Sequence, residues 1–138
     1  MRVLIADDDR LICDLMEEYV QRCGHEVVGK VTAGGLAVIR GFACSQPDLV
    51  LLDVMMPRCN GLTVAHALRS RSASVKLVLM SGMYEESHPF VQGCRVDAFI
   101  KKPLLYSDLW ATLSRLDLPA VATETPAVVM LPDFAVAV

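Results

Sequence analysis

Short apolar runs alternate along the chain with stretches in which apolar residues recur every three or four positions. Residues 2–6 are an apolar run that ends at three aspartates, which is typical of a buried strand opening into a polar loop. From Arg10 to Cys23 the apolar residues fall on one helical stripe, and Gly24 is predicted to end that helix. The chain therefore begins with a predicted strand and a predicted helix.

This strand-and-helix unit is predicted to occur five times in all. The further predicted elements occupy, in order, residues 27–31, 34–44, 48–53, 62–70, 75–80, 98–101 and 107–116. Pro89 and Gly93 interrupt residues 84–93, so the fourth helix is expected to be short, shifted or mobile. Ser107 is the predicted N-cap of the last helix.

The predicted strands are apolar on both sides, which indicates a parallel sheet covered by helices on both faces. The sequence thus predicts an α/β fold with a doubly wound, five-stranded parallel sheet. In such sheets, ligands bind outside the carboxyl ends of the strands. Functional side chains are therefore expected just after Ala6, Leu52, Met80 and Ile100.

Composition narrows the classes of function. With 138 residues, 54% of them hydrophobic, the chain fits one domain with a substantial core. The net charge of −3 and the scattered basic residues argue against direct nucleic-acid binding. Apolar runs fall far short of the ~20 residues of a membrane span. Aspartates at residues 7–9 interrupt the place where a signal peptide would continue, so a cytoplasmic location is expected.

The five cysteines are dispersed and include no CxxC pair. This pattern favours reduced thiols without a metal-binding role.

Polar residues stand at the predicted strand ends. Asp7 and Asp8 follow the first strand, and Asp53 ends the third. Ser81 follows the fourth strand and Lys102 the fifth. Three close carboxylates repel one another unless a cation lies among them, and Mg²⁺ is a hard cation that prefers oxygen ligands. One carboxylate can then attack phosphorus and form an aspartyl phosphate, while the metal and the lysine neutralise the transferring group.

In these motifs the chain resembles the receiver domain of two-component response regulators over residues 1–117. The motifs are Asp7-Asp8, Asp53-Val-Met-Met-Pro57 with Asn60-Gly61, Met80-Ser81-Gly82, and Phe99-Ile-Lys-Lys102-Pro103. The resemblance implies a flavodoxin-like sheet with strand order 2-1-3-4-5. It also implies a switch that catalyses its own phosphorylation and is not a turnover enzyme.

The resemblance assigns Asp53 as the phosphoacceptor. Asp8 would bind Mg²⁺ (or Mn²⁺) directly together with Asp53 and the backbone carbonyl of Met55, and Asp7 would assist through a water. Lys102, which directly precedes the proline, would pair first with the acceptor and then with the phosphoryl group.

Two further residues match the switch positions of the family. Ser81 would reorient toward the phosphoryl group, and Phe99 occupies the position of the aromatic switch residue. The donor would be a phosphohistidine on a sensor histidine kinase or a histidine phosphotransfer protein. A homodimer is compatible with the family, and no direct contact with nucleic acid or membrane is expected.

Plainer interpretations stay open at several positions. The aspartates at residues 7–9 could cap the following helix, Ser81 with Gly82 could be a plain turn, and Phe99 could be a core aromatic. The fold could serve as a phosphorylation-independent interaction module. A phosphatase of the haloacid dehalogenase class is disfavoured, because that class needs a second aspartate where Met55 stands.

Three departures from the family pattern concern lifetime and output. Met55 and Met83 occupy positions that line the path of attacking water, and neither orients water strongly, so slow self-dephosphorylation is expected. The interrupted fourth helix puts the usual dimer mode in doubt. Residues 118–138 form an apolar tail or linker rich in proline, alanine and valine, which could dock on apolar surface, add to a sheet edge or mediate self-association.

Overall fold

Strands and helices alternate strictly in the computed structural model, which describes residues 1–56 and 60–117. The elements are β1 (Arg2–Ala6), α1 (Arg10–Arg22), β2 (Glu26–Val31), α2 (Gly35–Ser45), β3 (Leu49–Asp53), α3 (Gly61–Arg71), β4 (Lys76–Ser81), α4 (Pro89–Gln92), β5 (Ala98–Lys101) and α5 (Tyr106–Leu116). Every predicted strand and helix is present, and where bounds were predicted the ends coincide or differ by one residue. The predicted tail at residues 118–138 lies outside the described residues.

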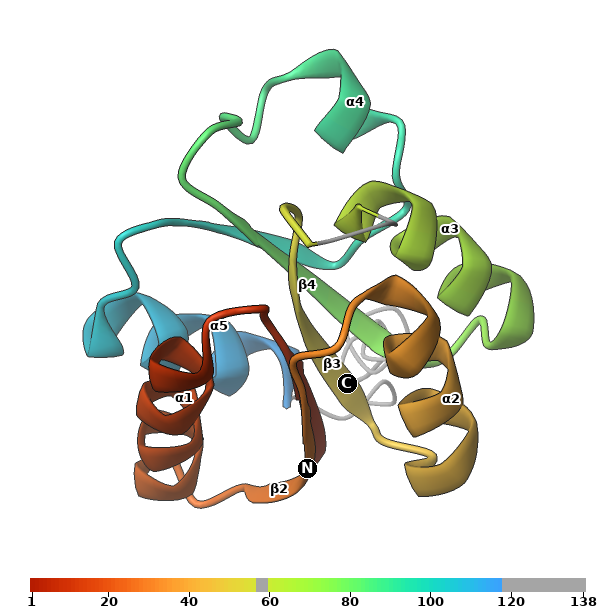
Figure 1. Cartoon of the computed structure of the whole chain (residues 1–138). Helices are drawn as coiled ribbons and strands as arrows, with labels where there is room; N and C mark the ends of the chain where they lie inside the picture. Colours follow the sequence, from red (N-terminus) through yellow and green to blue (C-terminus); the bar gives the residue numbers. More distant parts are fainter. Residues whose placement is uncertain (57–59, 118–138) are drawn as a thin grey trace, which may run out of the picture.

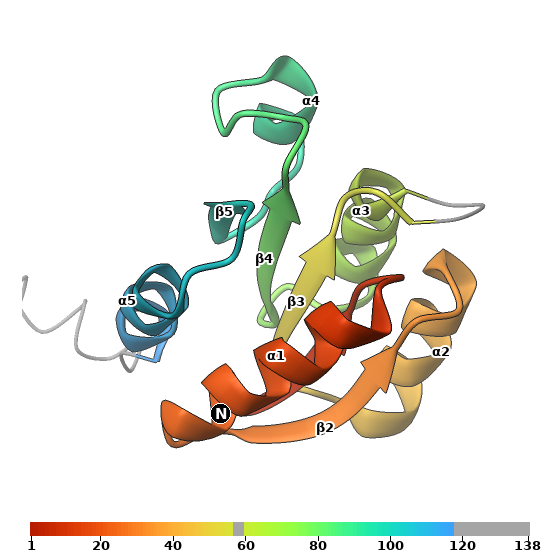
Figure 2. The ribbon, with the colours of Figure 1, turned by 60° about the vertical axis from the view of Figure 1, so that its left-hand side comes forward.

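The five strands form one parallel sheet in the order β2-β1-β3-β4-β5, so the predicted order is confirmed. Helices α1 and α5 cover one face, and α2 and α3 cover the other (Figures 1 and 2). All five residues of β3 are buried. Along this strand, Leu49 and Leu51 pack toward α1 and α5, whereas Val50 and Leu52 pack toward α2 and α3. A strand between two helical layers must be apolar on both sides, as its sequence is.

Helix α1 has a side-chain cap at its start and a glycine in a left-handed conformation just after its end. The side chain of Asp9 is the N-cap and accepts hydrogen bonds from the backbone amides of Leu11 and Ile12. After the C-cap residue Cys23, Gly24 adopts a φ of 88°, a left-handed conformation that glycine adopts without steric cost. The predicted stop at Gly24 is therefore confirmed.

The predicted cap of the last helix is wrong. Helix α5 begins at Tyr106 after Leu105, and no side-chain hydrogen bond caps it, so Ser107 already lies inside the helix. Leu104 and Leu109 are both buried on the side of the sheet that carries α1. Packing of these two leucines, rather than capping, sets the start of α5.

Helix α4 is short, as predicted, and spans only Pro89–Gln92. Pro89 lies in the first turn, where its missing N–H is not needed, so the proline starts the helix rather than interrupting it. His88 accepts a hydrogen bond from the amide of Phe90, and Gly93 follows the helix. In Figure 1, α4 stands beyond the carboxyl ends of the strands, away from the body of the sheet.

Among the described residues, no helix is long and apolar enough to cross a membrane. Within the same part of the chain, Cys13, Cys23, Cys44 and Cys94 are free cysteines. Cys59 lies outside the described residues.

Candidate functional site

The predicted site residues meet at the carboxyl edge of the sheet. Asp7 directly follows β1, Asp53 ends β3, Ser81 ends β4, and Lys102 directly follows β5. Asp7, Asp53 and Ser81 are the buried polar or charged residues of the described chain, with exposed fractions of 0%, 3% and 0%. Buried polar groups are costly unless they are paired, so their concentration at one edge indicates a functional site.

Carboxylate oxygens of Asp7, Asp8 and Asp53 all lie within 4.8 Å of one another. Burial, followed by the negative charge of Asp7, raises the pKa of Asp53 to about 6, although Lys102 and the backbone amide of Met55 act in the opposite direction. The site therefore holds more negative charge than its own lysine compensates. An oxygen-only donor set with excess negative charge fits a hard divalent cation such as Mg²⁺ or Mn²⁺.

Lys102 links two of the three carboxylates. Its Nζ lies 2.7 Å from Oδ2 of Asp7 and 3.3 Å from Oδ1 of Asp53. Burial alone would lower the pKa of Lys102, but the hydrogen bond to Asp7 and the charge of Asp53 outweigh it and raise that pKa. The shorter contact is with Asp7, so the lysine is bound to both carboxylates and not to Asp53 alone.

Ser81 has hydrogen-bond partners within its own loop. Its Oγ accepts hydrogen bonds from the backbone amides of Met83 at 3.0 Å and Tyr84 at 2.9 Å. These contacts are those of a plain turn, as one interpretation of Ser81 with Gly82 proposed. Ser81 also ends β4 at the edge of the sheet where Asp7 and Asp53 lie. A hydroxyl that leaves these two amides would loosen the start of the segment between β4 and α4.

The other residues singled out from the sequence are less buried. Phe99 is partly buried and packs against the core cluster on the α2 and α3 side. Met55 and Met83 are 47% and 63% exposed. Asp9 caps α1 with its side chain, so the capping interpretation holds for this aspartate and not for the whole run at residues 7–9.

Gly61 is a site residue whose importance the sequence reasoning did not explain. A Cβ atom at this position would lie 2.3 Å from the carbonyl oxygen of Asp53 and 2.8 Å from the Cα of Val54. The amide of Gly61 donates a 2.7 Å hydrogen bond to the carbonyl of Val54. Only glycine allows this close approach, which ties the start of α3 to the end of β3.

The sequence model of the response regulator receiver domain matches residues 3–114. The chain belongs to this family.

Relatives of this receiver domain are longer proteins. "Response regulator MprA" of Mycobacterium sp. strain KMS is 29% identical over 136 residues, which cover 95% of this chain and 58% of the relative. "Transcriptional regulatory protein AruR" of Pseudomonas aeruginosa is 35% identical over 107 residues, which cover 75% of this chain and 43% of the relative. The chain thus spans about half the length of the curated relatives it matches.

Solved structures agree on the fold. The response regulator TrrA of Thermotoga maritima, in complex with Mg²⁺ and BeF, matches with a TM-score of 0.75 and 26% identity over 83% of this chain and 97% of that chain. A CheY-like receiver domain of Methanospirillum hungatei matches with a TM-score of 0.75 and 25% identity over 84% of this chain and 93% of that chain.

The neighbours Asp8 and Asp9 are expected to have different roles in this receiver domain, Asp8 in binding Mg²⁺ and Asp9 in capping α1. Asp9→Ala should lower the free energy of unfolding by about 1 kcal/mol, because it removes the cap of α1, and should change Mg²⁺ affinity less than about threefold. Asp8→Ala should do the reverse, with a large loss of Mg²⁺ affinity and little change in stability. Urea unfolding and calorimetric Mg²⁺ titration measure the two effects, and a larger loss of affinity in Asp9→Ala would contradict the assignment.

Gly61→Ala is expected to displace the backbone of Asp53. Because the new methyl group meets backbone atoms at 2.3 and 2.8 Å, we expect a loss of about 1 to 3 kcal/mol of stability and weaker Mg²⁺ binding. Gly82→Ala is the matched control, since its Cβ would lie 3.6 Å from the nearest atom, the Cβ of Lys102. Equal stability and equal Mg²⁺ affinity in the two variants would show that the approach of Gly61 to Asp53 does not matter.

Proposed function

We propose that this receiver domain accepts a phosphoryl group on Asp53 from a phosphohistidine donor in a Mg²⁺-dependent reaction, and that this switches a protein-interaction surface. The observation that carries the proposal is the setting of Asp53. Its buried carboxylate lies within 4.8 Å of oxygens of Asp7 and Asp8, and 3.3 Å from Nζ of Lys102.

Asp53 is the nucleophile in the proposed reaction. One of its carboxylate oxygens attacks phosphorus, the bond between phosphorus and the donor's imidazole nitrogen breaks, and the electron pair returns to that nitrogen. Asp8, Asp53 and the backbone carbonyl of Met55 would hold Mg²⁺ (or Mn²⁺), with Asp7 reaching it through a water. The ion supplies positive charge that offsets the charge of the transferring group.

Lys102 and Ser81 would contact the phosphoryl group once it is attached to Asp53. Lys102 already contacts Asp53 and Asp7, so its ammonium can turn to the phosphoryl oxygens without a large displacement. Ser81 would give up the amides of Met83 and Tyr84 to donate to a phosphoryl oxygen. Phe99 would follow as the aromatic switch, and the segment between β4 and α4 would be the first to change.

The proposal extends to partners and organisation. Residues 1–117 would form the receiver domain, with residues 118–138 as a separate tail or linker. The donor would be a sensor histidine kinase or a histidine phosphotransfer protein in the cytoplasm. The domain would act through protein contacts, which allow a homodimer, and would touch neither nucleic acid nor membrane itself.

Intact-mass measurement tests the proposed function. After incubation with acetyl phosphate and Mg²⁺, the protein should gain the mass of one phosphoryl group, and chelation of Mg²⁺ with EDTA should prevent the gain. If wild-type protein gains no phosphoryl group, then the alternative, a phosphorylation-independent interaction module on the same fold, becomes the better explanation.

The lifetime of the phosphorylated state is expected to depend on Met83. This side chain is exposed and apolar and cannot orient an attacking water, so Met83→Glu should speed phosphate loss by about tenfold. The rate follows from the decay of the phosphorylated mass after the donor is removed. Met83→Gln, which has nearly the same size without the charge, is the control, and an unchanged rate in Met83→Glu would refute the prediction.

A further inference from the structure

A cavity of about 400 Å³ lies between α3 and the short helix α4. Its lining includes His66, on α3, and Cys94, which follows α4. The Sγ of Cys94 lies 3.7 Å from Nε2 of His66. None of Asp7, Asp8 and Asp53 lines this cavity, which we call the α3–α4 cavity. A thiol and an imidazole in contact are two of the ligands that zinc takes in proteins.

Cys94 and His66 are brought together by two separate elements. Helix α4 ends at Gln92 with Gly93 as its C-cap, so Cys94 lies just outside the helix. The amide of Cys94 donates a 3.1 Å hydrogen bond to the carbonyl of Val91, and the residue is only 6% exposed. His66, by contrast, is exposed on α3. The pair therefore combines a recessed thiol in a fixed position with an imidazole that solvent reaches.

The separation of the two donor atoms fits a tetrahedral zinc ion. Zn–S bonds of about 2.3 Å and Zn–N bonds of about 2.0 Å place two ligands of a tetrahedron about 3.6 Å apart. The observed distance from Sγ to Nε2 is 3.7 Å, so both atoms can reach one ion without a rearrangement of α3 or α4. The other contacts of the thiol, to the carbonyl oxygens of Phe90 and Leu62, are long at 3.5 and 3.8 Å. Little is therefore lost when the thiol gives up its proton.

Water has to fill the other positions around such an ion. Within residues 1–56 and 60–117, groups of three or more metal-ligating side chains are limited to the carboxylate cluster of Asp7, Asp8 and Asp53. The cavity has ample room for an ion and two waters, since one water occupies about 30 Å³ in the liquid. Because Cys94 is recessed, a second copy of the chain is poorly placed to bring its own Cys94 to the same ion.

We propose that the α3–α4 cavity binds one Zn²⁺ ion through the thiolate of Cys94 and Nε2 of His66, with two waters completing the tetrahedron. The S–H bond breaks as the S–Zn bond forms, and the proton goes to solvent. The bound ion would link α3 to the segment that follows α4, a helix that stands away from the body of the sheet (Figure 1). The proposal goes beyond phosphoryl transfer and needs no phosphorylation at Asp53.

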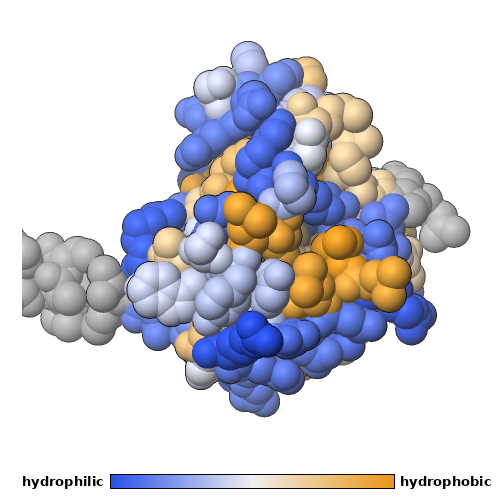
Figure 3. Space-filling model, turned by 90° about the vertical axis from the view of Figure 1, so that its left-hand side faces the viewer, coloured by the Kyte–Doolittle hydropathy of each residue, from blue (hydrophilic) through white to orange (hydrophobic). Residues whose placement is uncertain are grey.

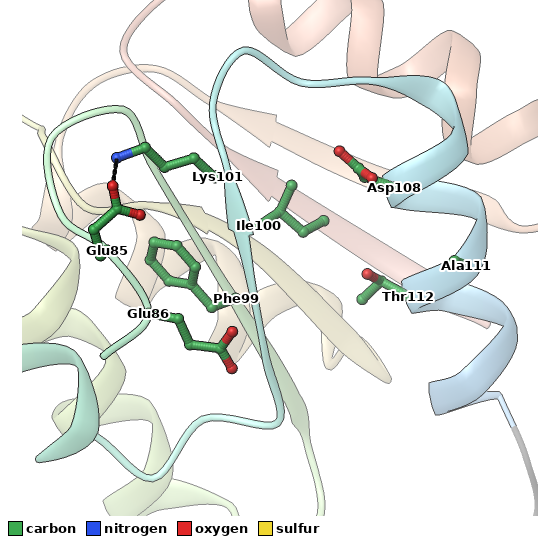
Figure 4. Close-up of a pocket in the computed structure, with 8 residues that line it drawn as sticks. All are labelled: Glu85, Glu86, Phe99, Ile100, Lys101, Asp108, Ala111 and Thr112. Carbon is green, nitrogen blue, oxygen red and sulfur yellow. Dashed lines mark hydrogen bonds and ion pairs between the residues drawn. The ribbon is translucent and has the colours of Figure 1, made fainter. Parts of the chain in front are cut away.

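Oxygen donors elsewhere on the molecule would compete for Zn²⁺ but cannot supply sulfur. Another cavity of about 400 Å³, beside β5, is lined in part by Glu85, Glu86, Lys101 and Asp108. Glu85 is paired with Lys101 at 3.0 Å, and Asp108 projects from α5 on the side opposite Glu86 (Figure 4). Hydrophilic residues also prevail over much of the molecular face that carries α5 (Figure 3). A test must therefore report a bond to sulfur and not metal binding alone.

Absorption spectroscopy of the reduced full chain, with Co²⁺ as the probe, tests the proposal. A thiolate ligand gives Co²⁺ a charge-transfer band in the near ultraviolet, which carboxylates do not. Saturating Mg²⁺ is present throughout, so that Asp7, Asp8 and Asp53 are occupied. We expect the band to saturate at one Co²⁺ per chain and to disappear when Zn²⁺ is added, because zinc binds such ligands more tightly than cobalt. A wild-type chain without this band would overturn the proposal.

Matched variants assign the ligands. Cys94→Ser should abolish the band. His66→Gln, at an exposed position where folding is not at risk, should weaken Co²⁺ binding at least about tenfold. Cys44→Ser and His25→Gln replace the same two residue types outside the cavity, and should leave the band in place and the affinity within about twofold. A band that survives in Cys94→Ser, or equal weakening in the two histidine variants, would overturn the proposal.

Three other outcomes are distinguishable. If light scattering shows that Zn²⁺ makes the wild-type chain dimeric but leaves Cys94→Ser monomeric, a second copy supplies ligands and the proposed site within one chain is wrong. A protein that takes up a phosphoryl group on Asp53 but shows no thiolate band would refute this inference alone. A protein that shows the band but gains no phosphoryl mass would refute the proposed function alone.

Discussion

Asp53→Asn is expected to abolish phosphoryl uptake and, in metal-free buffer at pH 8, to make the fold more stable than wild type. The amide of asparagine is not a nucleophile toward phosphorus, so no phosphorylated species should form. Stability should rise because wild-type Asp53 is ionised at pH 8 in a buried site beside Asp7. Its pKa of about 6, against an ordinary value of 3.8, corresponds to a cost of about 3 kcal/mol for the ionised form.

The size of this stability difference depends on pH. The folded protein binds a proton on Asp53 more tightly than the unfolded chain does, so the stability of wild type rises as pH falls from above 6 toward 4. The advantage of Asp53→Asn should therefore be about 1 to 3 kcal/mol at pH 8 and shrink toward zero near pH 4. Urea unfolding in EDTA at several pH values measures it.

Mg²⁺ provides the internal control for Asp53→Asn. The ion should stabilise wild type more than the variant, because wild type offers it the full carboxylate cluster. A stability difference that does not change with pH would contradict the assigned charge state of Asp53. Residual phosphoryl uptake by the variant would show that another residue is an acceptor.

Lys102→Met is expected to slow phosphoryl uptake about 100-fold or more and to destabilise the fold by about 3 kcal/mol in metal-free buffer at pH 8. The methionine keeps the apolar stem but leaves the carboxylates of Asp7 and Asp53 without their ammonium partner. The transferring phosphoryl group also loses its positive contact. Quench-flow or timed intact-mass measurement gives the rate, and urea unfolding gives the stability.

The adjacent lysine is the matched control. Lys101 is more exposed than Lys102, pairs with the exposed Glu85, and does not contact the carboxylate cluster. Lys101→Met should therefore change stability by no more than about 0.5 kcal/mol and leave the rate of uptake unchanged. Similar losses in the two variants would show that the effect of Lys102→Met is not due to its place between Asp7 and Asp53.

Periodicity was sufficient to predict the sheet and its functional edge. Residues 49–52 are apolar throughout because β3 is buried on both faces, and such a run is typical of a central strand. Once parallel strands were inferred, their carboxyl ends had to lie at one edge, and this brought Asp53, Ser81 and Lys102 together. The resemblance to receiver domains then assigned a role to each of these residues, which the predicted fold had already placed at one edge.

The details that sequence could not predict all depend on distances between residues remote in the chain. The N-cap position of α5 at Leu105, two residues before the expected Ser107, follows from the burial of Leu104 and Leu109. The shorter contact of Lys102 with Asp7, at 2.7 Å against 3.3 Å for Asp53, joins residues that follow different strands. The need for glycine at position 61 appears only when α3 is placed against β3. Neither propensity nor spacing encodes these separations.

The burial of β3 has a mechanical consequence for the proposed switch. The strand pairs with β1 on one side and β4 on the other, and its alternating side chains fill both cores at once. A displacement of its carboxyl end would open voids in two helical layers together, which close-packed interiors resist. Asp53 therefore stands at the end of a strand that is held at both edges and packed on both faces. A group attached to it cannot be accommodated by retreat of the strand, so the surrounding loops have to yield instead.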